Sequence, residues 1–434
     1  MQIEKNNPKV MNGWVMYDWA NSVYNLVIAS AIFPIFYQNQ TSVIDKVSGN
    51  VISDKVQFWG FELINTELYN YVFSFAYLIV VFTTPILSGV ADFWGNKKFF
   101  LKLFCAIGSL SCICLYFFNA QHLEWSMFAV MMACVGFWGS LVFYNAYLPE
   151  IAEPALHDKL SARGFTMGYI GSTILLVASL IAIKVFNFNV RYVFILVGLW
   201  WIGFAHITYW RLPKSVIRKN IKNPFLNGFK ELKKVFGEIK EQFVLRKFLL
   251  SYFVYNCGVQ TVMIVAVPFA SKEIFTGSDK SGLIAAVILI QLVGAVGAWL
   301  MSNLSSKIGN FNVIKISVFI WMIICILGYF IKTQIQFYFL ACTVGFVMGS
   351  IQSMSRSTFA KLIPATNDNT SYFSFFDVAE KIGLVIGVFL FGFIEGLTNN
   401  MRLSIVFLII IFILGFTLLL RIGPKEGKAA LEND

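Results

Sequence analysis

Residues 89–98 read Gly-Val-Ala-Asp-Phe-Trp-Gly-Asn-Lys-Lys, and a long apolar run lies on either side of them. Gly89 and Gly95 permit close helix packing and a tight turn within this stretch. Asp92 can cap a neighbouring helix or pair with a cation. The two lysines at its end favour the cytoplasmic side of a membrane. The stretch therefore predicts a short cytoplasmic turn between two membrane-spanning helices.

The rest of the chain repeats this alternation of apolar runs and charged connections. Of its 434 residues, 58% are hydrophobic and only 13% are charged, whereas a soluble domain carries about 25% charged residues. A helix needs about 20 mostly apolar residues to cross a bilayer. Twelve runs are candidates, at roughly 12–37, 69–91, 99–119, 125–148, 163–186, 190–211, 248–271, 281–303, 312–332, 335–357, 371–397 and 400–421. We therefore expect an all-α integral membrane protein with twelve transmembrane helices.

The connection at 212–247 would divide the chain into a six-helix half at 1–211 and a second at 248–434. If both termini are cytoplasmic, most of the 34 Lys and Arg residues lie in cytoplasmic segments, as the positive-inside rule requires. The net charge of +11 is thus a topology signal and not a sign of nucleic-acid binding. We expect a monomeric, multi-pass protein of the plasma membrane, the inner membrane of a bacterium.

The two longest connections carry patterns of their own. In 212–247, apolar residues recur at helical spacing, and lysines occupy other faces: Phe225, Phe229, Leu232, Phe236, Ile239 and Phe243, with Lys230, Lys233, Lys234 and Lys240. This predicts an amphipathic helix on the cytoplasmic leaflet in contact with anionic lipid, or a surface helix packed on the bundle. In 38–68, extended pieces at 43–47 and 51–58 flank Ser48-Gly49-Asn50, which predicts a small external hairpin.

The two halves resemble one another weakly. Tyr17-Asp18 of the first helix corresponds to Tyr255-Asn256 of the seventh, and Gly139-Ser140 of the fourth to Gly349-Ser350 of the tenth. Internal repetition of this kind is typical of transporters built from two related halves. It predicts pseudo-symmetric six-helix halves.

The stretch at 89–98 resembles the G-x-x-x-D-x-x-G-x-[RK]-[RK] signature of the major facilitator superfamily. The corresponding loop of the second half, 302–310, keeps Lys307 and Gly309 but lacks the acid. This difference leaves open whether the second half forms a matching gate.

Three further stretches are similar to a narrower group. They read Tyr-Asp-Trp-Ala-Asn-Ser at 17–22, Ser-Ala-Arg-Gly-Phe-Thr-Met-Gly-Tyr-Ile-Gly at 161–171 and Gln-Ser-Met-Ser-Arg-Ser at 352–357. Together they resemble the "unknown major facilitator" group, bacterial relatives of the fungal autophagy-associated vacuolar amino-acid effluxer. The resemblance implies a major facilitator fold and solute export or exchange, with amino acids as the solutes of the fungal relative.

Polar residues inside spanning helices are costly and usually face a cavity or a partner. In the first helix, Asp18, Asn21 and Asn25 share one face, with Tyr17 beside them. This face is a candidate wall of a path for a polar solute. The alternative is a structural cluster near the cytoplasmic end, in which Asp18 pairs with a cation such as Arg356.

Other helices supply further candidates for the lining. They are Tyr144 and Asn145 in the fourth helix, Tyr255, Asn256 and Gln260 in the seventh, and Gln352 in the tenth. Amides and phenols suit a zwitterionic or neutral polar solute better than a polyanion. Such residues also join helices in many membrane proteins, so each assignment has a structural alternative.

A charged trio lies in the eleventh helix. Asp377 and Lys381 are one turn apart and can pair, with Glu380 close by. Burial and a nearby lysine act in opposite directions on the pKa of a carboxyl group, so the trio could couple transport to protons or gate the path. Sodium could serve in place of protons. The alternative is a neutralised pair that locks this helix to its neighbours.

Charges at the cytoplasmic helix ends predict a gate. We expect Glu150, Arg163, Asp92 and Arg356 to form a network that closes the inner side.

These features favour a secondary carrier that alternates access around a midplane site. There is no nucleotide-binding loop, and the seven cysteines lie within apolar runs, so we expect no cofactor, no metal site and no disulfides. An enzyme would need converging nucleophile, base or metal groups, which the sequence does not bring together. The remaining alternative is a transporter-like receptor or scaffold.

Overall fold

The computed structural model describes residues 4–44, 51–213, 223–275, 281–398, 400–423, 426–427 and 429. Within them it contains twelve helical segments long and apolar enough to cross a membrane, which confirms the predicted fold class. The first segment is continuous from Pro8 to Thr41 and is made of α1 (Pro8–Val23), a π-helix η1 (Tyr24–Ile32) and α2 (Phe33–Thr41). The other spanning helices are α3 (Asn65–Trp94), α4 (Lys97–Cys114, extended by the 3-10 turn η2, Leu115–Phe117), α5 (Leu123–Asn145), α7 (Pro154–Phe186), α8 (Val190–Arg211), α10 (Phe243–Glu273), α11 (Ser281–Ile308), α12 (Asn310–Phe330), α13 (Gln334–Leu362), α14 (Asn369–Thr398) and α15 (Met401–Leu420).

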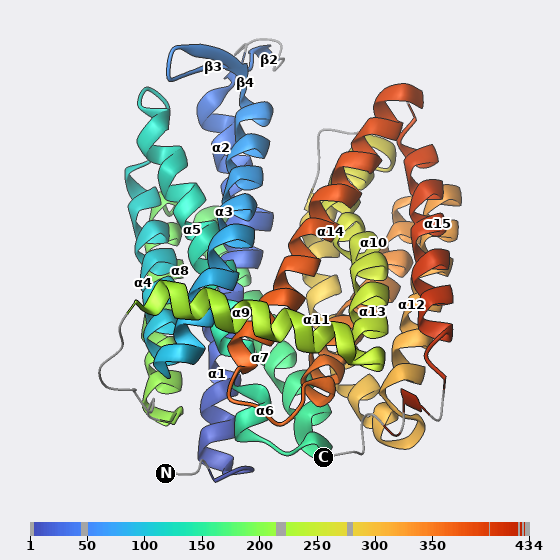
Figure 1. The fold of residues 1–434 in the computed structure, drawn as a ribbon. Helices are drawn as coiled ribbons and strands as arrows, with labels where there is room; N and C mark the ends of the chain where they lie inside the picture. Colours follow the sequence, from blue (N-terminus) through green and yellow to red (C-terminus); the bar gives the residue numbers. More distant parts are fainter. Residues whose placement is uncertain are drawn as a thin grey trace.

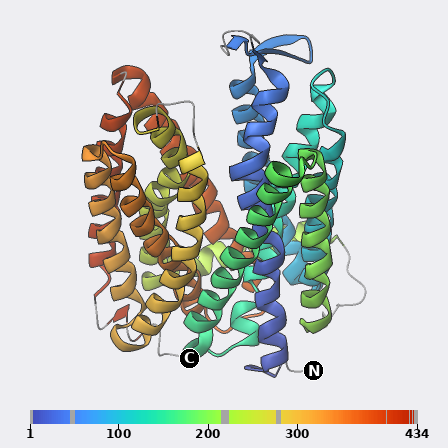
Figure 2. The same ribbon diagram turned by 180° about the vertical axis from the view of Figure 1, so that it is seen from behind.

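These helices form two groups, α1–α8 and α10–α15 (Figure 1). The groups converge at the end of the molecule that carries both chain termini and diverge towards the end that carries the strands, and Figure 2 shows the same from behind. We call these ends the terminus side and the hairpin side. Helices α7 and α3 of the first group contact α11, α13 and α14 of the second.

Helix ends follow from local capping. The Asn7 side chain caps the first helix by accepting a hydrogen bond from the Lys9 N–H at 3.0 Å, with Pro8 at the first helical position. Gly95 ends α3 in the left-handed region at φ 74°, and its N–H donates to the Ala91 carbonyl at 2.8 Å. The tight turn predicted from this glycine is therefore present.

Two predicted helix starts were wrong. The fifth spanning helix begins at Pro154 and not near 163, because its first turns are polar and an apolar-run criterion does not detect them. The seventh begins at Phe243, so this residue belongs to α10 and not to the linker helix.

The linker forms α9 (Pro224–Glu241), which crosses α3 on the terminus side (Figure 1). The backbones cross closely, since a Cβ on Gly89 would collide with the Gly228 carbonyl. Val235 and Ile239 are buried, whereas the aromatic residues Phe225, Phe229 and Phe236 stay exposed. The predicted helix is thus present and packed on the bundle, with one aromatic face left outward.

The segment predicted to be external forms two short hairpins. Strand β1 (Val43–Ile44) pairs with β2 (Val51–Ser53), and β3 (Lys55–Phe58) pairs with β4 (Phe61–Ile64). The predicted turn at Ser48-Gly49-Asn50 lies outside the described residues. The second hairpin was not predicted, although Trp59 and Gly60 at its turn have positive φ, as two-residue hairpin turns require.

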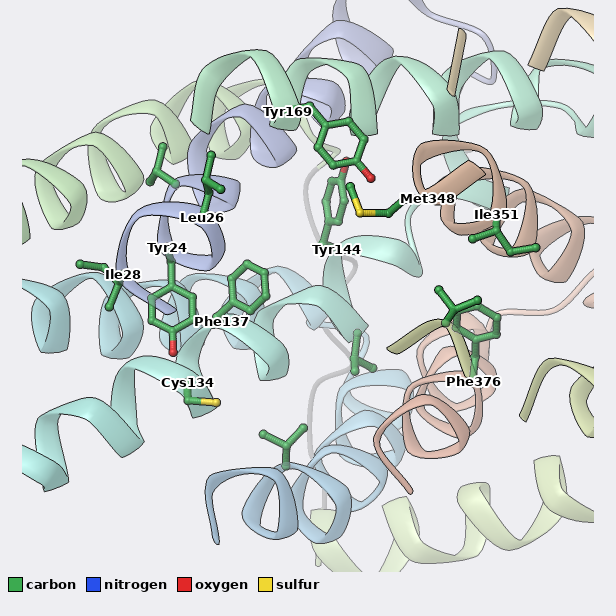
Figure 3. Close-up of a cluster of buried hydrophobic side chains, with 14 of the residues drawn as sticks. Tyr24, Leu26, Ile28, Cys134, Phe137, Tyr144, Tyr169, Met348, Ile351 and Phe376 are labelled. Atoms are coloured by element: carbon green, nitrogen blue, oxygen red, sulfur yellow. The ribbon is translucent and has the colours of Figure 1, made fainter. Parts of the chain in front are cut away.

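The apolar core continues across the two halves near the terminus side. Figure 3 shows Tyr144 of α5 and Tyr169 of α7 close to Met348 of α13. A Cβ on Gly349 would also approach the Tyr169 ring, to 3.2 Å. The halves are therefore in direct contact at this level, and polar groups placed here are withdrawn from water.

Candidate functional site

An ion pair joins the two halves at the centre of the terminus side. Asp18 lies in α1 and Arg356 in α13, with 3.3 Å between Oδ2 and Nη2, and their side chains are 7% and 4% exposed. The hydroxyl of Tyr144 donates to the same carboxylate oxygen at 2.8 Å. A buried pair of this kind is stable only when the remaining donors and acceptors are satisfied.

The guanidinium of Arg356 meets that requirement. Its Nε donates to the Ser161 hydroxyl and its Nη2 to the Ser161 carbonyl, both at 2.9 Å. Its Nη1 donates to Asn145 Oδ1 at 3.2 Å, and the group lies 4.2 Å from the ring centre of Phe165. One side chain thus joins α13 to α1, α5 and α7. The predicted alternative for Asp18, a pair with Arg356, is the arrangement present here.

Gly164 makes this pair possible. It follows Ser161 on α7 by one turn, and a Cβ there would meet the Asp18 carboxylate and come within 2.9 Å of Arg356 Nη2. Asp18 and Arg356 therefore meet beside a glycine that no charge pattern would single out, and Arg356 connects Asp18 to the predicted candidate Asn145.

Two predicted amides remain unused nearby. The Nδ2 groups of Asn21 in α1 and Asn256 in α10 have no hydrogen-bond partner within the described residues. Asn21 is 1% exposed and Asn256 is 4% exposed. A buried donor without a partner costs about 1–3 kcal/mol of folding stability, so an unpaired amide at these positions calls for a functional explanation. Asn25 lies within the π-helix η1, an irregularity often found at functional sites.

The other predicted lining residues contact neighbouring helices through hydrogen bonds or ring packing. Tyr255 shares a 2.7 Å hydrogen bond with Ser355. Gln352 accepts from the Tyr169 hydroxyl at 2.8 Å, which links α13 to α7. Tyr17 is buried against Tyr144, with 5.0 Å between ring centres. Tyr169 was not among the predicted residues, because an isolated tyrosine in an apolar run carries no distinguishing signal.

In α14, Asp377, Glu380 and Lys381 lie close together, as their spacing predicts. Lys381 Nζ is 2.5 Å from Asp377 Oδ1 and 3.6 Å from Glu380 Oε2. Lys381 is fully buried and also lies 3.7 Å from the ring centre of Trp138, across the interface on α5.

Glu380 is hydrogen-bonded to α10, a neighbouring helix of the same half. It accepts from Gln260 Nε2 at 2.7 Å and from the Tyr252 hydroxyl at 3.3 Å, so the predicted residue Gln260 is engaged here. Asp377 Oδ2 has no hydrogen-bond partner among the described residues. The trio thus contains one bound carboxylate and one with a free acceptor oxygen, both beside a single lysine.

A second cross-half contact lies further towards the terminus side, where Asp92 caps α14. Its carboxylate accepts from the N–H groups of Thr370 and Ser371, at 3.3 and 2.6 Å, and from the Ser371 hydroxyl at 2.7 Å. The capping role predicted for Asp92 is therefore present, across the halves. We call this contact the α3–α14 junction.

A related contact joins α7 to the end of α11 and the start of α12. Asp158 of α7 accepts from Ser305 at 2.9 Å and from Asn310 Nδ2 at 2.6 Å, and it pairs with Lys361 at 2.8 Å. We call this contact the α7–α12 junction. Asp158 was not predicted, because it lies on α7 and not in the stretch 302–310 that corresponds to the first-half motif.

The two remaining gate candidates differ in their placement. Glu150, in the short helix α6 (Leu148–Ile151), pairs with Lys97 and accepts from Asn369 Nδ2 at 3.0 Å, so it joins the α3–α14 junction. Arg163 is exposed and donates to Asn12 at 2.7 Å. Its expected place in the charge network is a wrong prediction, because its position on α7 directs it away from the buried face that carries Ser161.

Comparison with known proteins agrees with this fold. The family described as "Vacuole effluxer Atg22 like" matches residues 6–432. The chain belongs to this family. The uncharacterized MFS-type transporter YxiO of Bacillus subtilis is 30% identical over 97% of the chain and 96% of its own length. Autophagy-related protein 22 of Saccharomyces cerevisiae is 23% identical over 99% of the chain and 93% of its own length.

Solved structures of major facilitator transporters share the fold of this Atg22-like protein. FucP in its outward conformation superposes with a TM-score of 0.66 at 15% identity, covering 95% of this chain and 98% of that one. The human organic anion transporter MFSD10 gives 0.70 at 12% identity, covering 95% of this chain and all of the other. The Atg22-like chain is thus a multi-pass membrane protein with the fold of an MFS-type transporter.

Proposed function

We propose that this protein is a secondary transporter that exports or exchanges a small polar solute, an amino acid or a related compound, by alternating access. The observation that carries the proposal is the pair of buried amides, Asn21 and Asn256, whose Nδ2 groups find no hydrogen-bond partner in the described part of the chain and which lie on the first spanning helix of each half. Major facilitator carriers bind their solutes between the halves. Amide N–H groups donate to a carboxylate or carbonyl oxygen, which an amino acid supplies.

The cross-half contacts support a gated mechanism. The Asp18–Arg356 pair and the two junctions hold the halves together on the terminus side. Their separation would open this side, and each contact would then exchange protein partners for water. We infer that the terminus side is cytoplasmic, that the membrane is the inner membrane of a bacterium, and that the protein acts as a monomer.

We further propose that the trio of α14 couples this movement to protons, with sodium as the alternative ion. Asp377, Glu380 and Lys381 place two carboxylates beside one buried ammonium group, an arrangement whose charge depends on proton occupancy. Gln260 and Tyr252, on α10, sense that charge directly through their bonds to Glu380.

Replacement of Glu380 by Gln tests the coupling. In reconstituted vesicles, Glu380→Gln should flatten or shift the pH dependence of solute transport. Glu395→Gln is the matched control, since this acid lies on the same helix and pairs with Lys272 at 2.8 Å near the hairpin side. An unchanged pH profile in Glu380→Gln would remove the trio from the coupling mechanism.

A thermal-shift screen tests the solute class. Amino acids, short peptides, sugars and nucleosides are added to the purified protein at two pH values, because a ligand of the folded state raises its stability by mass action. An amino-acid shift that is lost in Asn256→Ala and accompanied by vesicle uptake supports the proposal. Binding without uptake favours the receptor or scaffold alternative, and chemical conversion of the solute would indicate an enzyme.

A further inference from the structure

A cavity of about 540 Å³ lies on the terminus side between α1, α7 and α11. It is separate from the buried Asp18–Arg356 pair, and it includes Arg163, the residue that the charge network did not take up. Because α1 and α7 belong to one half and α11 to the other, its walls come from both halves.

Most polar residues of this cavity gather at one end; Thr166, which lies deeper, donates its hydroxyl to the Ala295 carbonyl at 3.1 Å. Asn12 lies near the start of the first helix, Lys159 and Arg163 in the first turns of α7, and Asn303 near the end of α11. All four positions are close to the terminus-side ends of their helices. Deeper along the same three helices, the lining becomes apolar, with Met16, Met167 and Trp299.

The positive charges at this end of the cavity favour an anionic ligand. Lys159 and Arg163 are one turn apart on α7, and like charges at that spacing repel one another. Both are exposed, and Lys159 has no hydrogen bond or ion pair to another described residue. An anion between them would relieve the repulsion and receive donors from both side chains.

The apolar end selects a ligand with a hydrocarbon part. Trp299 is 57% exposed, although it lies within a spanning helix, so its ring borders the bilayer. Tryptophan is enriched where headgroups meet hydrocarbon. The cavity thus changes from cationic to apolar in the direction in which a phospholipid changes from headgroup to acyl chain.

We propose that this cavity binds an acidic phospholipid, with its phosphate between Lys159 and Arg163 and an acyl chain along Met16, Met167 and Trp299. Since the walls come from both halves, the bound lipid bridges them and stabilises the arrangement in which the terminus side is closed. The site is independent of the solute that the protein carries.

Lipid retention measured by native mass spectrometry tests this site. The full-length protein is equilibrated with equal amounts of phosphatidylglycerol and phosphatidylcholine and then progressively delipidated. Two cations near a headgroup are expected to favour phosphatidylglycerol by about 10- to 30-fold. Lys159→Gln/Arg163→Gln should lose this preference, whereas Lys159→Arg/Arg163→Lys, which keeps both charges, should retain it.

Lys184→Gln/Lys307→Gln is the matched control, because it removes two exposed charges from α7 and α11 outside the cavity. Equal loss of preference in this control would overturn the proposal, as would full retention in Lys159→Gln/Arg163→Gln. In a second arm, inorganic phosphate is added to protein in phosphatidylcholine. Thermal stabilisation by phosphate that matches the effect of phosphatidylglycerol would show a site for a free anion and overturn the lipid assignment.

Discussion

The α3–α14 and α7–α12 junctions both join the two halves on the terminus side. They differ in which helix of the contact carries the acid. In the α3–α14 junction, the acid lies in the last turn of α3, and the partners are backbone N–H groups at the start of α14. In the α7–α12 junction, the acid lies in α7, and the end of α11 and the start of α12 supply only neutral donors, Ser305 and Asn310. A lysine, Lys361, completes this second contact.

The difference shows that a motif can lose its acid in the sequence while the structure still has a carboxylate at the corresponding contact. The loop 302–310 lacks the acid of its counterpart, yet a carboxylate is present because the facing helix provides it. The two junctions should also lose different amounts of stability when the carboxylate of each is replaced by a neutral amide. Among the described residues Asp92 makes no ion pair, since the neighbouring Lys97 pairs with Glu150, whereas Lys361 pairs with Asp158 and its side chain is only 10% exposed.

The largest effect is expected for Asp158→Asn. This change leaves Lys361 buried without its counter-ion, which should destabilise the described arrangement by about 3–5 kcal/mol. The free energy of unfolding in mixed micelles measures the loss. The double variant Asp158→Asn/Lys361→Met should be more stable than the single one, and an equal or greater loss would contradict the role of the lysine.

Moving the acid to the loop sharpens the comparison. Lys361 Nζ is 3.0 Å from Asn310 Oδ1, so Asp158→Asn/Asn310→Asp places a carboxylate on the loop side of the same lysine. We expect recovery of more than half of the single-variant loss, about 2 kcal/mol, because the buried charge is again paired. The same unfolding measurement applies. No recovery would mean that the contact requires its acid on α7.

A smaller effect is expected for Asp92→Asn. The amide oxygen still accepts one hydrogen bond from the start of α14, but the charge-assisted bonds and the favourable interaction with the helix N-terminus are weakened. The expected loss is about 1–2 kcal/mol by the same measurement. A loss as large as that of Asp158→Asn would show that the two junctions do not differ in the way described.

The smallest effect is expected for Lys234→Ala in α9. This lysine donates to Asp368, just before α14, at 2.8 Å, and the hydrogen bond raises its pKa. A raised lysine pKa contributes stability that is complete below the ordinary value and is lost only as the pH rises through the higher folded-state value. The stability difference from wild type should therefore be at most about 1 kcal/mol and constant from pH 6 to 9.

Local signals predicted much of what is present. The Asp377–Lys381 pair lies one turn apart on a single helix, so spacing alone places the two groups together. The cap formed by Asp92 and the turn at Gly95 likewise follow from residue chemistry, although the partner helix of Asp92 does not. The unused amide of Asn21 lies on the predicted polar face, but only packing shows that its neighbours leave it without a partner.

The apolar pattern of the chain is enough to predict the twelve spanning helices found within the described residues, because an apolar run of sufficient length has no other stable state in a bilayer. The tertiary structure alone decided which side chains meet across the halves. Asp158 and Lys361 are 203 residues apart, and Arg163 turns outward while Ser161 turns inward, towards Arg356. Helical periodicity fixes positions within one helix, whereas these contacts depend on how different helices rotate and pack against one another.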